Sequence, residues 1–163
     1  MKIYFSDLAY VDENKFFYPV PLNAGFIASY ALKHLPDLEI KIFKNPGILL
    51  DAVADDPPDV LAMTYYAWNA NLDAAIAKKC KVANPHLRVV LGGPNFNHDD
   101  PEWIEWFFRA NTYADLFITG EGEQSFLKYL QILLENDLEL TSSDVSKWPS
   151  SFYSYDHTHG EVI

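Results

Sequence analysis

The stretch VLAMTYYAWNANLDAAIAKKCKVANPHLRVVLGGP, residues 60–94, decides the fold class of this protein. Residues 60–65 are apolar on both faces of an extended chain, which predicts a strand in the middle of a sheet. Residues 71–82 repeat apolar side chains at helical spacing, and residues 87–91 form a second apolar run that ends at Gly92-Gly93-Pro94. A strand, a helix and a strand in this order are typical of a βαβ unit with parallel strands.

The same alternation continues on both sides of this unit. Further strands are predicted at residues 2–7, 38–43 and 114–119, and further helices at residues 23–35, 46–54, 101–109 and 124–134. Five strand–helix repeats with right-handed crossovers predict a doubly wound α/β domain, with a five-stranded parallel sheet between two layers of helices. The period stops near Asp137, so we expect a domain at residues 1–137 and a linker or tail at residues 138–163.

The composition limits the possible functions. The chain has 12 Lys and Arg against 23 Asp and Glu, a formal charge of −11, which argues against nucleic acid or an anionic membrane as a partner. The single cysteine, Cys80, excludes an intrachain disulfide, a CxxC redox pair and an all-thiolate zinc or iron–sulfur site. The N-terminus reaches a charge too early for a signal peptide, and no apolar run approaches the ~20 residues that span a bilayer. We therefore expect a cytoplasmic protein.

Ligands of open parallel sheets bind beyond the carboxyl ends of the strands, so the loops that follow the strands hold the candidate residues. The loop after the first strand, residues 8–22, is long and aromatic; it is either a functional loop or a flap over the sheet edge. The third strand leads into Thr64-Tyr65-Tyr66-Ala67-Trp68-Asn69, whose hydroxyl, phenol, indole and amide groups suit a polar aromatic ligand. Alternatively, Trp68 packs against its neighbours and Asn69 caps the next helix.

Glycines follow the fourth and fifth strands. In Gly92-Gly93-Pro94-Asn95 the missing β-carbons let another group approach the backbone, although a tight turn explains the glycines equally well. We expect a bulky residue at Gly93 to block a ligand and to leave the fold intact. Gly120-Glu121-Gly122-Glu123 leads into the last helix, whose N-terminus favours carboxylates. This segment lacks GxGxxG spacing and its acids would repel a pyrophosphate, so NAD or FAD is not expected.

The remaining candidates have simpler explanations. Asp156-His157-Thr158-His159 contains metal-ligand residue types, but on a segment that we expect to be solvated. Asp100 precedes Pro101 and is expected to cap a helix, and Cys80 lies on a helical stripe with Ile76, as core residues do. The sequence contains neither a GxSxG elbow nor a Walker loop. It therefore favours binding over catalysis.

Taken in order, these segments resemble the N-terminal cobalamin (vitamin B12)-binding domain of cobalamin-dependent radical S-adenosylmethionine (SAM) enzymes. The resemblance covers residues 1–137 and rests on Pro21, Leu22 and Gly25, on residues 64–69, on residues 84–94 and on residues 114–123. It implies a Rossmann-like domain whose strand ends bury the dimethylbenzimidazole nucleotide tail of the cofactor. The residues implied in cofactor binding are Leu22, Gly25, Thr64, Tyr65, Trp68, Asn69, Gly92, Gly93, Pro94, Gly120, Glu121 and Gly122. Of these, Trp68 and Asn69 would lie nearer the corrin and the others nearer the tail.

Two departures from the family pattern refine this expectation. The common cobalamin motif Asp-x-His-x-x-Gly provides a histidine as the lower cobalt ligand, whereas Asp7-Leu8-Ala9 provides none; cobalamin is therefore expected in a base-off form without histidine ligation. The C-x3-C-x2-C motif that binds a [4Fe–4S] cluster is absent, so the cluster and SAM would belong to a radical SAM domain outside this chain. We expect a corrinoid-binding module, without activity alone, of a methyltransferase-type enzyme.

Two other interpretations remain open. The chain could be another doubly wound binding module, but a receiver-like domain needs an Asp after the third strand and a Lys after the fifth, where this chain has Thr64 and Gly120. A flavodoxin-like domain needs a Ser/Thr-rich phosphate loop after the first strand, where this loop is aromatic. The second of these interpretations is a small hydrolase with Glu121 or Glu123 as its general base, although the sequence offers neither glutamate a partnered nucleophile.

Overall fold

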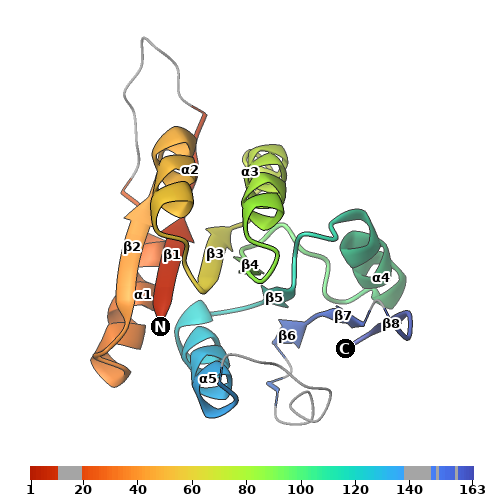
Figure 1. Cartoon of the computed structure of the whole chain (residues 1–163). Coiled ribbons are helices and arrows are strands. Elements are labelled where there is room, and N and C mark those ends of the chain that lie inside the picture. Colours follow the sequence, from red (N-terminus) through yellow and green to blue (C-terminus); the bar gives the residue numbers. More distant parts are fainter. Residues whose placement is uncertain (11–19, 138–147, 150, 157) are drawn as a thin grey trace.

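A computed structural model of the chain describes residues 1–10, 20–137, 148–149, 151–156 and 158–163. It contains the predicted alternation of strands and helices (Figure 1). The strands are β1 (Lys2–Ser6), β2 (Glu39–Phe43), β3 (Val60–Thr64), β4 (Arg88–Gly92) and β5 (Leu116–Ile118). The helices are α1 (Leu22–His34), α2 (Pro46–Asp55), α3 (Ala70–Ala83), α4 (Pro101–Ala110) and α5 (Gly122–Glu135). The doubly wound α/β class is therefore confirmed.

The sheet has the strand order β2-β1-β3-β4-β5 with every neighbouring pair parallel. The chain first adds β2 on one side of β1 and then places β3 on the other side. The order of growth therefore reverses between β1 and β3, which is where doubly wound sheets bind their ligands.

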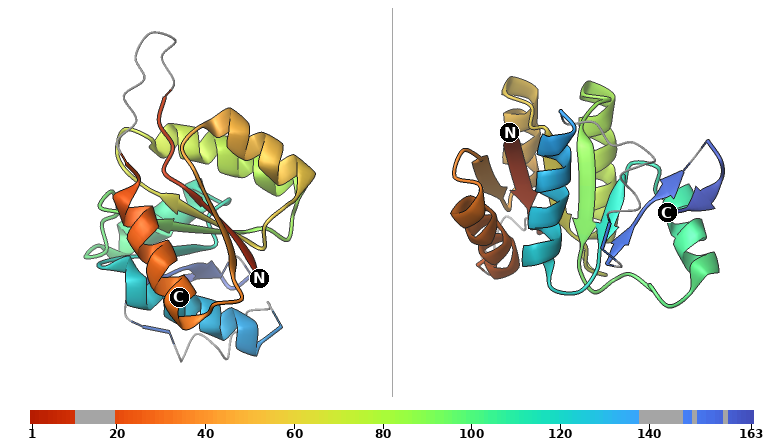
Figure 2. Two further views of the ribbon diagram at one scale, coloured as in Figure 1. Left: turned by 90° about the vertical axis from the view of Figure 1, so that its left-hand side faces the viewer. Right: turned by 90° about the horizontal axis from the view of Figure 1, so that it is seen from below.

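Helices cover both faces of this sheet. Figure 2 shows α1 and α5 on one face and α2 and α3 on the other; the side chains of α4 join the core on the α2/α3 face. Side chains alternate between the two cores along each strand, as the pleat requires. On β3, Leu61 and Met63 face α2 and α3, while Val60 and Ala62 face α1 and α5.

Local signals explain where two of the helices begin. The side chains of Asn45 and Asp100 accept hydrogen bonds from the first backbone N–H groups of α2 and α4, and a proline opens each helix. The cap predicted at Asp100 is thus confirmed. Among the described helices, none combines the length and the apolar character that a membrane span requires.

The segment after α5 adds a strand that the sequence did not predict. β6 (Phe152–Tyr153) pairs antiparallel with β5, so the sheet has six strands instead of the expected five. Beyond it, β7 (Tyr155–Asp156) and β8 (Glu161–Val162) form a hairpin. Phe152 is buried against the α1/α5 face, and the Ser154 hydroxyl donates to the Asp115 carbonyl oxygen at 2.6 Å. Strands of two residues carry no periodicity, which is why the pattern missed them. The domain boundary at Asp137 stays a prediction.

Candidate functional site

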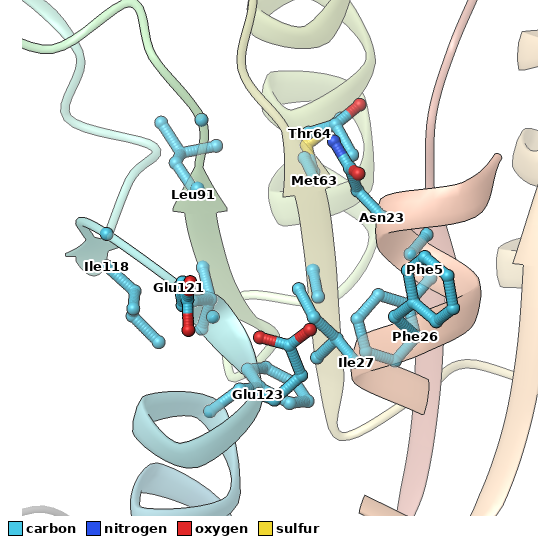
Figure 3. Close-up of a pocket in the computed structure, with 18 of the residues that line it drawn as sticks. Phe5, Asn23, Phe26, Ile27, Met63, Thr64, Leu91, Ile118, Glu121 and Glu123 are labelled. Carbon is cyan, nitrogen blue, oxygen red and sulfur yellow. The ribbon is translucent and has the colours of Figure 1, made fainter. Parts of the chain in front are cut away.

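A pocket of about 470 Å³ lies at the carboxyl ends of the strands, on the α1/α5 face of the sheet (Figure 3). Its volume falls within the ~300–1,000 Å³ typical of small-molecule sites. It is lined by Phe5, Asn23, Ala24, Phe26, Ile27, Ala62, Met63, Thr64, Tyr66, Val90, Leu91, Gly92, Gly93, Pro94, Ile118, Gly120, Glu121, Gly122, Glu123 and Phe126.

Small side chains on the central strands create this hollow. Thr64 of β3 lies opposite Gly92 of β4, and one step earlier on the same face Ala62 lies opposite Val90. Large side chains fill the same face toward the sheet edges, where Phe5 and Ile118 stand. The volume that larger residues would occupy at the centre is therefore left to the pocket.

The two adjacent glycines of β4 and its loop have different reasons to be glycine. A β-carbon built on Gly92 meets no atom closer than the Ile118 carbonyl oxygen at 3.5 Å, an ordinary contact. A β-carbon on Gly93 would lie 2.4 Å from the Tyr65 carbonyl oxygen, and Gly93 also has a φ of +150°. Gly93 is thus required by the close approach of the Tyr65 backbone, whereas Gly92 keeps the pocket open.

This geometry argues against the expectation that a bulky residue at Gly93 would leave the fold intact. We expect Gly93→Ala alone to lower the free energy of unfolding by about 1–3 kcal/mol, because the β-carbon collides with backbone that cannot move aside. Urea unfolding followed by circular dichroism measures this change. The matched control is Gly92→Ala, for which we expect a much smaller loss. Equal losses at the two positions would contradict this assignment of the glycines.

Polar groups gather at the mouth of the pocket. The Asn23 amide of α1 donates a hydrogen bond of 2.7 Å to the hydroxyl of Tyr66, which follows β3. The Tyr66 ring stacks on Trp68 with ring centroids 4.3 Å apart and planes 9° apart. Across the pocket, Glu121 is exposed and Glu123 half-buried at the start of α5. Among the described lining residues there are these two carboxylates and neither Lys nor Arg, so the charged side chains at the mouth are negative.

The structure brings together part of the set that the resemblance implied. Thr64, Gly92, Gly93, Pro94, Gly120, Glu121 and Gly122 line the pocket. Leu22, Gly25, Tyr65, Trp68 and Asn69 do not. Tyr65 is buried on the opposite face of the sheet, with edge-on ring contacts to Phe107 and Phe117. Because successive strand residues point to opposite faces, Thr64 and Tyr65 cannot both face one pocket.

Asn69 is buried, and its side chain forms hydrogen bonds within the β3–α3 turn. Its carbonyl oxygen accepts from the Tyr66 N–H at 2.8 Å, and its amide donates to the Thr64 carbonyl oxygen at 2.9 Å. Asn69 thus shapes the turn that presents Tyr66 to the pocket. Trp68 is 66% exposed and stands beside the mouth through its stack on Tyr66.

Several lining residues were not among the sequence candidates, notably Phe5, Asn23, Ala62, Val90 and Phe126. The period of two along the strands could have found Ala62 and Val90, since they share a face with Thr64 and Gly92. Residues contributed by α1 and α5 carry no comparable signal. Most of the aromatic loop after β1, residues 11–19, lies outside the described residues.

The other candidate residues do not form a reactive centre. Cys80 is buried, and burial raises the pKa of its thiol to about 11, which agrees with a core role. Asp156 pairs with His159 in the β7–β8 hairpin; His157 lies outside the described residues. Within the part of the chain that the structure describes, no group of three His, Cys, Asp or Glu side chains could hold a metal ion.

One buried carboxylate stands apart from the pocket. Asp73 of α3 has no exposed surface and lies on the α2/α3 face, and neither of its oxygens has a hydrogen-bond partner among the described residues. Burial, and secondarily the negative charge of Asp7, raise the pKa of Asp73 to about 8. Asp7 itself accepts hydrogen bonds from the Thr64 hydroxyl at 3.0 Å and from Lys44 at 2.9 Å.

Comparison with known proteins relates this arrangement to characterised chains. No protein-family model matches the sequence. The chain is 33% identical over 116 residues to 2-(S-pantetheinyl)-carbapenam-3-carboxylate methyltransferase of Streptantibioticus cattleyicolor, a match that covers 68% of this chain and 16% of the relative. It is 32% identical over 131 residues to the cobalamin-dependent radical SAM methyltransferase TokK of Streptomyces tokunonensis, covering 77% of this chain and 19% of TokK. The matches thus span less than a fifth of these relatives' length.

Solved structures share the fold at lower sequence identity. The cobalamin-dependent SAM radical enzyme OxsB, with aqua-cobalamin and SAM bound, superposes with a TM-score of 0.67 at 18% identity, over 99% of this chain and 21% of OxsB. A cobalamin-binding protein from Desulfitobacterium hafniense superposes with a TM-score of 0.53 at 14% identity, over 80% of this chain and 57% of that protein. These likenesses show that the fold is the one found in cobalamin-binding proteins.

Proposed function

We propose that this chain, which is homologous to a segment of cobalamin-dependent radical SAM methyltransferases, binds a corrinoid. The nucleotide tail of the corrinoid would enter the pocket at the strand ends. The observation that carries the proposal is the hollow at Thr64 and Gly92. It is largely apolar and lies where doubly wound folds bind ligands.

The lining fits an uncharged, flat base better than a free nucleotide. Apolar side chains from the sheet, α1 and α5 surround the hollow, as burial of an aromatic base requires. The carboxylates of Glu121 and Glu123 at the mouth would repel a doubly charged terminal phosphate more strongly than the singly charged phosphodiester of a corrinoid's nucleotide tail. A flavodoxin-like use of the pocket, with an anchored phosphate, is disfavoured for the same reason.

The proposed state of the cofactor is base-off and without histidine ligation. Burying the base in the pocket removes it from the cobalt, and no histidine is among the described residues that line the pocket. Thr64, Gly92 and Ile27 would hold the tail, and Trp68 with the rim of the pocket would face the corrin. When bound, the corrinoid supplies cobalt-centred methyl chemistry, while the chain's contribution is burial and positioning.

The proposed partner is a radical SAM domain in the same enzyme, with methyl transfer as the overall reaction and no activity in this chain alone. Three exposed apolar side chains lie on α1 and in the β3–α3 turn, the elements that carry Asn23 and Tyr66 of the mouth: Leu22 is 59%, Phe26 61% and Trp68 66% exposed. Exposed apolar side chains of this kind suit a surface that a large ligand or a second domain covers.

Titration of the chain with hydroxocobalamin and with methylcobalamin tests the proposal. We expect stoichiometric co-elution in gel filtration and a base-off visible spectrum. FMN, whose doubly charged terminal phosphate the acidic mouth disfavours, serves as the control ligand and should not co-elute. A base-on spectrum would contradict burial of the tail, and absence of binding at concentrations of tens of micromolar would contradict the function itself.

A further inference from the structure

The buried side chains that line the pocket at the sheet and at α5 offer a bound base no hydrogen-bond donors. We define the floor as the buried side chains that close the pocket at the sheet and at α5: Phe5, Ala62, Val90, Ile118 and Phe126. All five are apolar. The backbones of the four sheet residues lie in the paired strands β1, β3, β4 and β5, so the ladder takes up their hydrogen-bonding groups.

Donors nearer the mouth are largely engaged. The Thr64 hydroxyl donates its hydrogen bond to the Asp7 carboxylate, and the Asn23 amide donates one to the Tyr66 hydroxyl. Glu121 and Glu123 accept hydrogen bonds but, as carboxylates, donate none. Among the described lining residues, the donors that remain include the Tyr66 hydroxyl and the second amide hydrogen of Asn23 at the mouth, and the first backbone N–H groups of α5, which receive no side-chain cap.

From this distribution we infer that the pocket selects corrinoids whose lower base is a benzimidazole over corrinoids whose lower base is a purine. The inference rests on the proposed function and specifies its ligand class. Each base joins its ribose through the five-membered ring, so the six-membered ring enters first. In dimethylbenzimidazole that ring carries methyl groups, which match an apolar floor. In adenine it carries acceptor nitrogens and an amine, which the floor leaves unpaired.

Discrimination by unpaired polar groups is expected to be substantial. Buried acceptors without donors weaken binding by about tenfold or more, because the water that they lose is not replaced. The carboxylates at the mouth could receive the adenine amine but could not satisfy its ring nitrogens. A purine that shifts toward the rim to reach the donors there leaves the apolar floor unfilled and loses that burial instead.

The test compares the affinities of this chain for cobalamin, adeninylcobamide and cobinamide, which lacks a base. We expect cobalamin to bind at least about tenfold more tightly than adeninylcobamide, with adeninylcobamide close to cobinamide. Equal affinities for cobalamin and adeninylcobamide would overturn the inference and leave the proposed function standing. If none of the three binds, the proposed function fails, and the inference with it.

A pair of variants locates the selectivity on the floor. Val90→Thr is nearly isosteric and adds a hydroxyl to the floor, so we expect the ratio of the two affinities to fall by about threefold. Val89→Thr makes the same change on the adjacent residue, which faces the other core, and should leave the ratio unchanged. Equal ratios in the two variants would place the discrimination elsewhere. The wild-type ratio decides the inference even if either variant fails to fold.

Discussion

Gly92→Leu is expected to weaken hydroxocobalamin binding by about 100-fold or more while the chain stays folded, because a leucine side chain would occupy the hollow itself. Gly92 shares its face with Val90 and lines the pocket beside Thr64. A β-carbon at Gly92 meets no atom closer than 3.5 Å, so the backbone tolerates a side chain there. The affinity is measured by visible absorbance titration.

Two further variants make this result interpretable. Gly92→Ala adds a single carbon and should give an intermediate loss of affinity. Ala83→Leu adds apolar bulk at an exposed position of α3, on the other face of the sheet, and should bind as the wild type does. Circular dichroism and thermal unfolding check that each variant is folded. A folded Gly92→Leu protein with unchanged affinity would remove the ligand from this pocket.

Asp73→Asn is expected to stabilise the protein at alkaline pH. With a pKa of about 8 in the folded chain, Asp73 stays protonated up to about that pH, while in the unfolded chain it ionises near its ordinary value of about 3.9. The folded state therefore binds more protons between these values. The resulting stability is fully present below about pH 4 and is lost as the pH rises to about 8.

The effect is large because the Asp73 side chain is buried and has no hydrogen-bond partner within the described part of the chain. Ionisation of Asp73 would put a charge on the α2/α3 face, near the negative charge of Asp7. We expect Asp73→Asn to raise the free energy of unfolding at pH 8 by about 3 kcal/mol and to change it little at pH 4. Urea unfolding across this pH range measures both values. The control is Asp51→Asn, at an exposed position of α2, which should keep the wild-type dependence of the free energy of unfolding on pH. If Asp73→Asn also keeps the wild-type dependence, Asp73 is ionised in the folded protein and the prediction is wrong.

Much of the architecture could be predicted because the signals are local. Apolar runs such as Val60–Thr64 and helices such as α3 are recognisable by their periods. Parallel connections then place the carboxyl ends of all these strands at one edge, which makes Thr64 and Gly92 candidates from their positions in the sequence alone. The sixth strand was missed because its contribution, Phe152–Tyr153, is defined by pairing with β5 and not by its own pattern.

The candidate site was harder to predict than the fold. Tyr65 and Asn69 lie close in sequence to pocket residues, yet one packs into the opposite core and the other closes a turn. The sequence alone does not distinguish the role of Gly92 from that of Gly93. Their roles separate only when the distance to the Tyr65 carbonyl oxygen is known.

By itself, the sequence determined the order of the strands and helices along the chain, since that order follows from short-range periodicity. It also determined the edge of the sheet where ligands bind, since the strands of right-handed βαβ units are parallel. The tertiary structure alone decided which face of β3 and β4 opens into a pocket, because α1 and α5 must be in place before a hollow exists between helices and sheet. It also decided that Asp73 is buried without a hydrogen-bond partner among the described residues. Packing joins residues distant along the chain, and no local pattern records it.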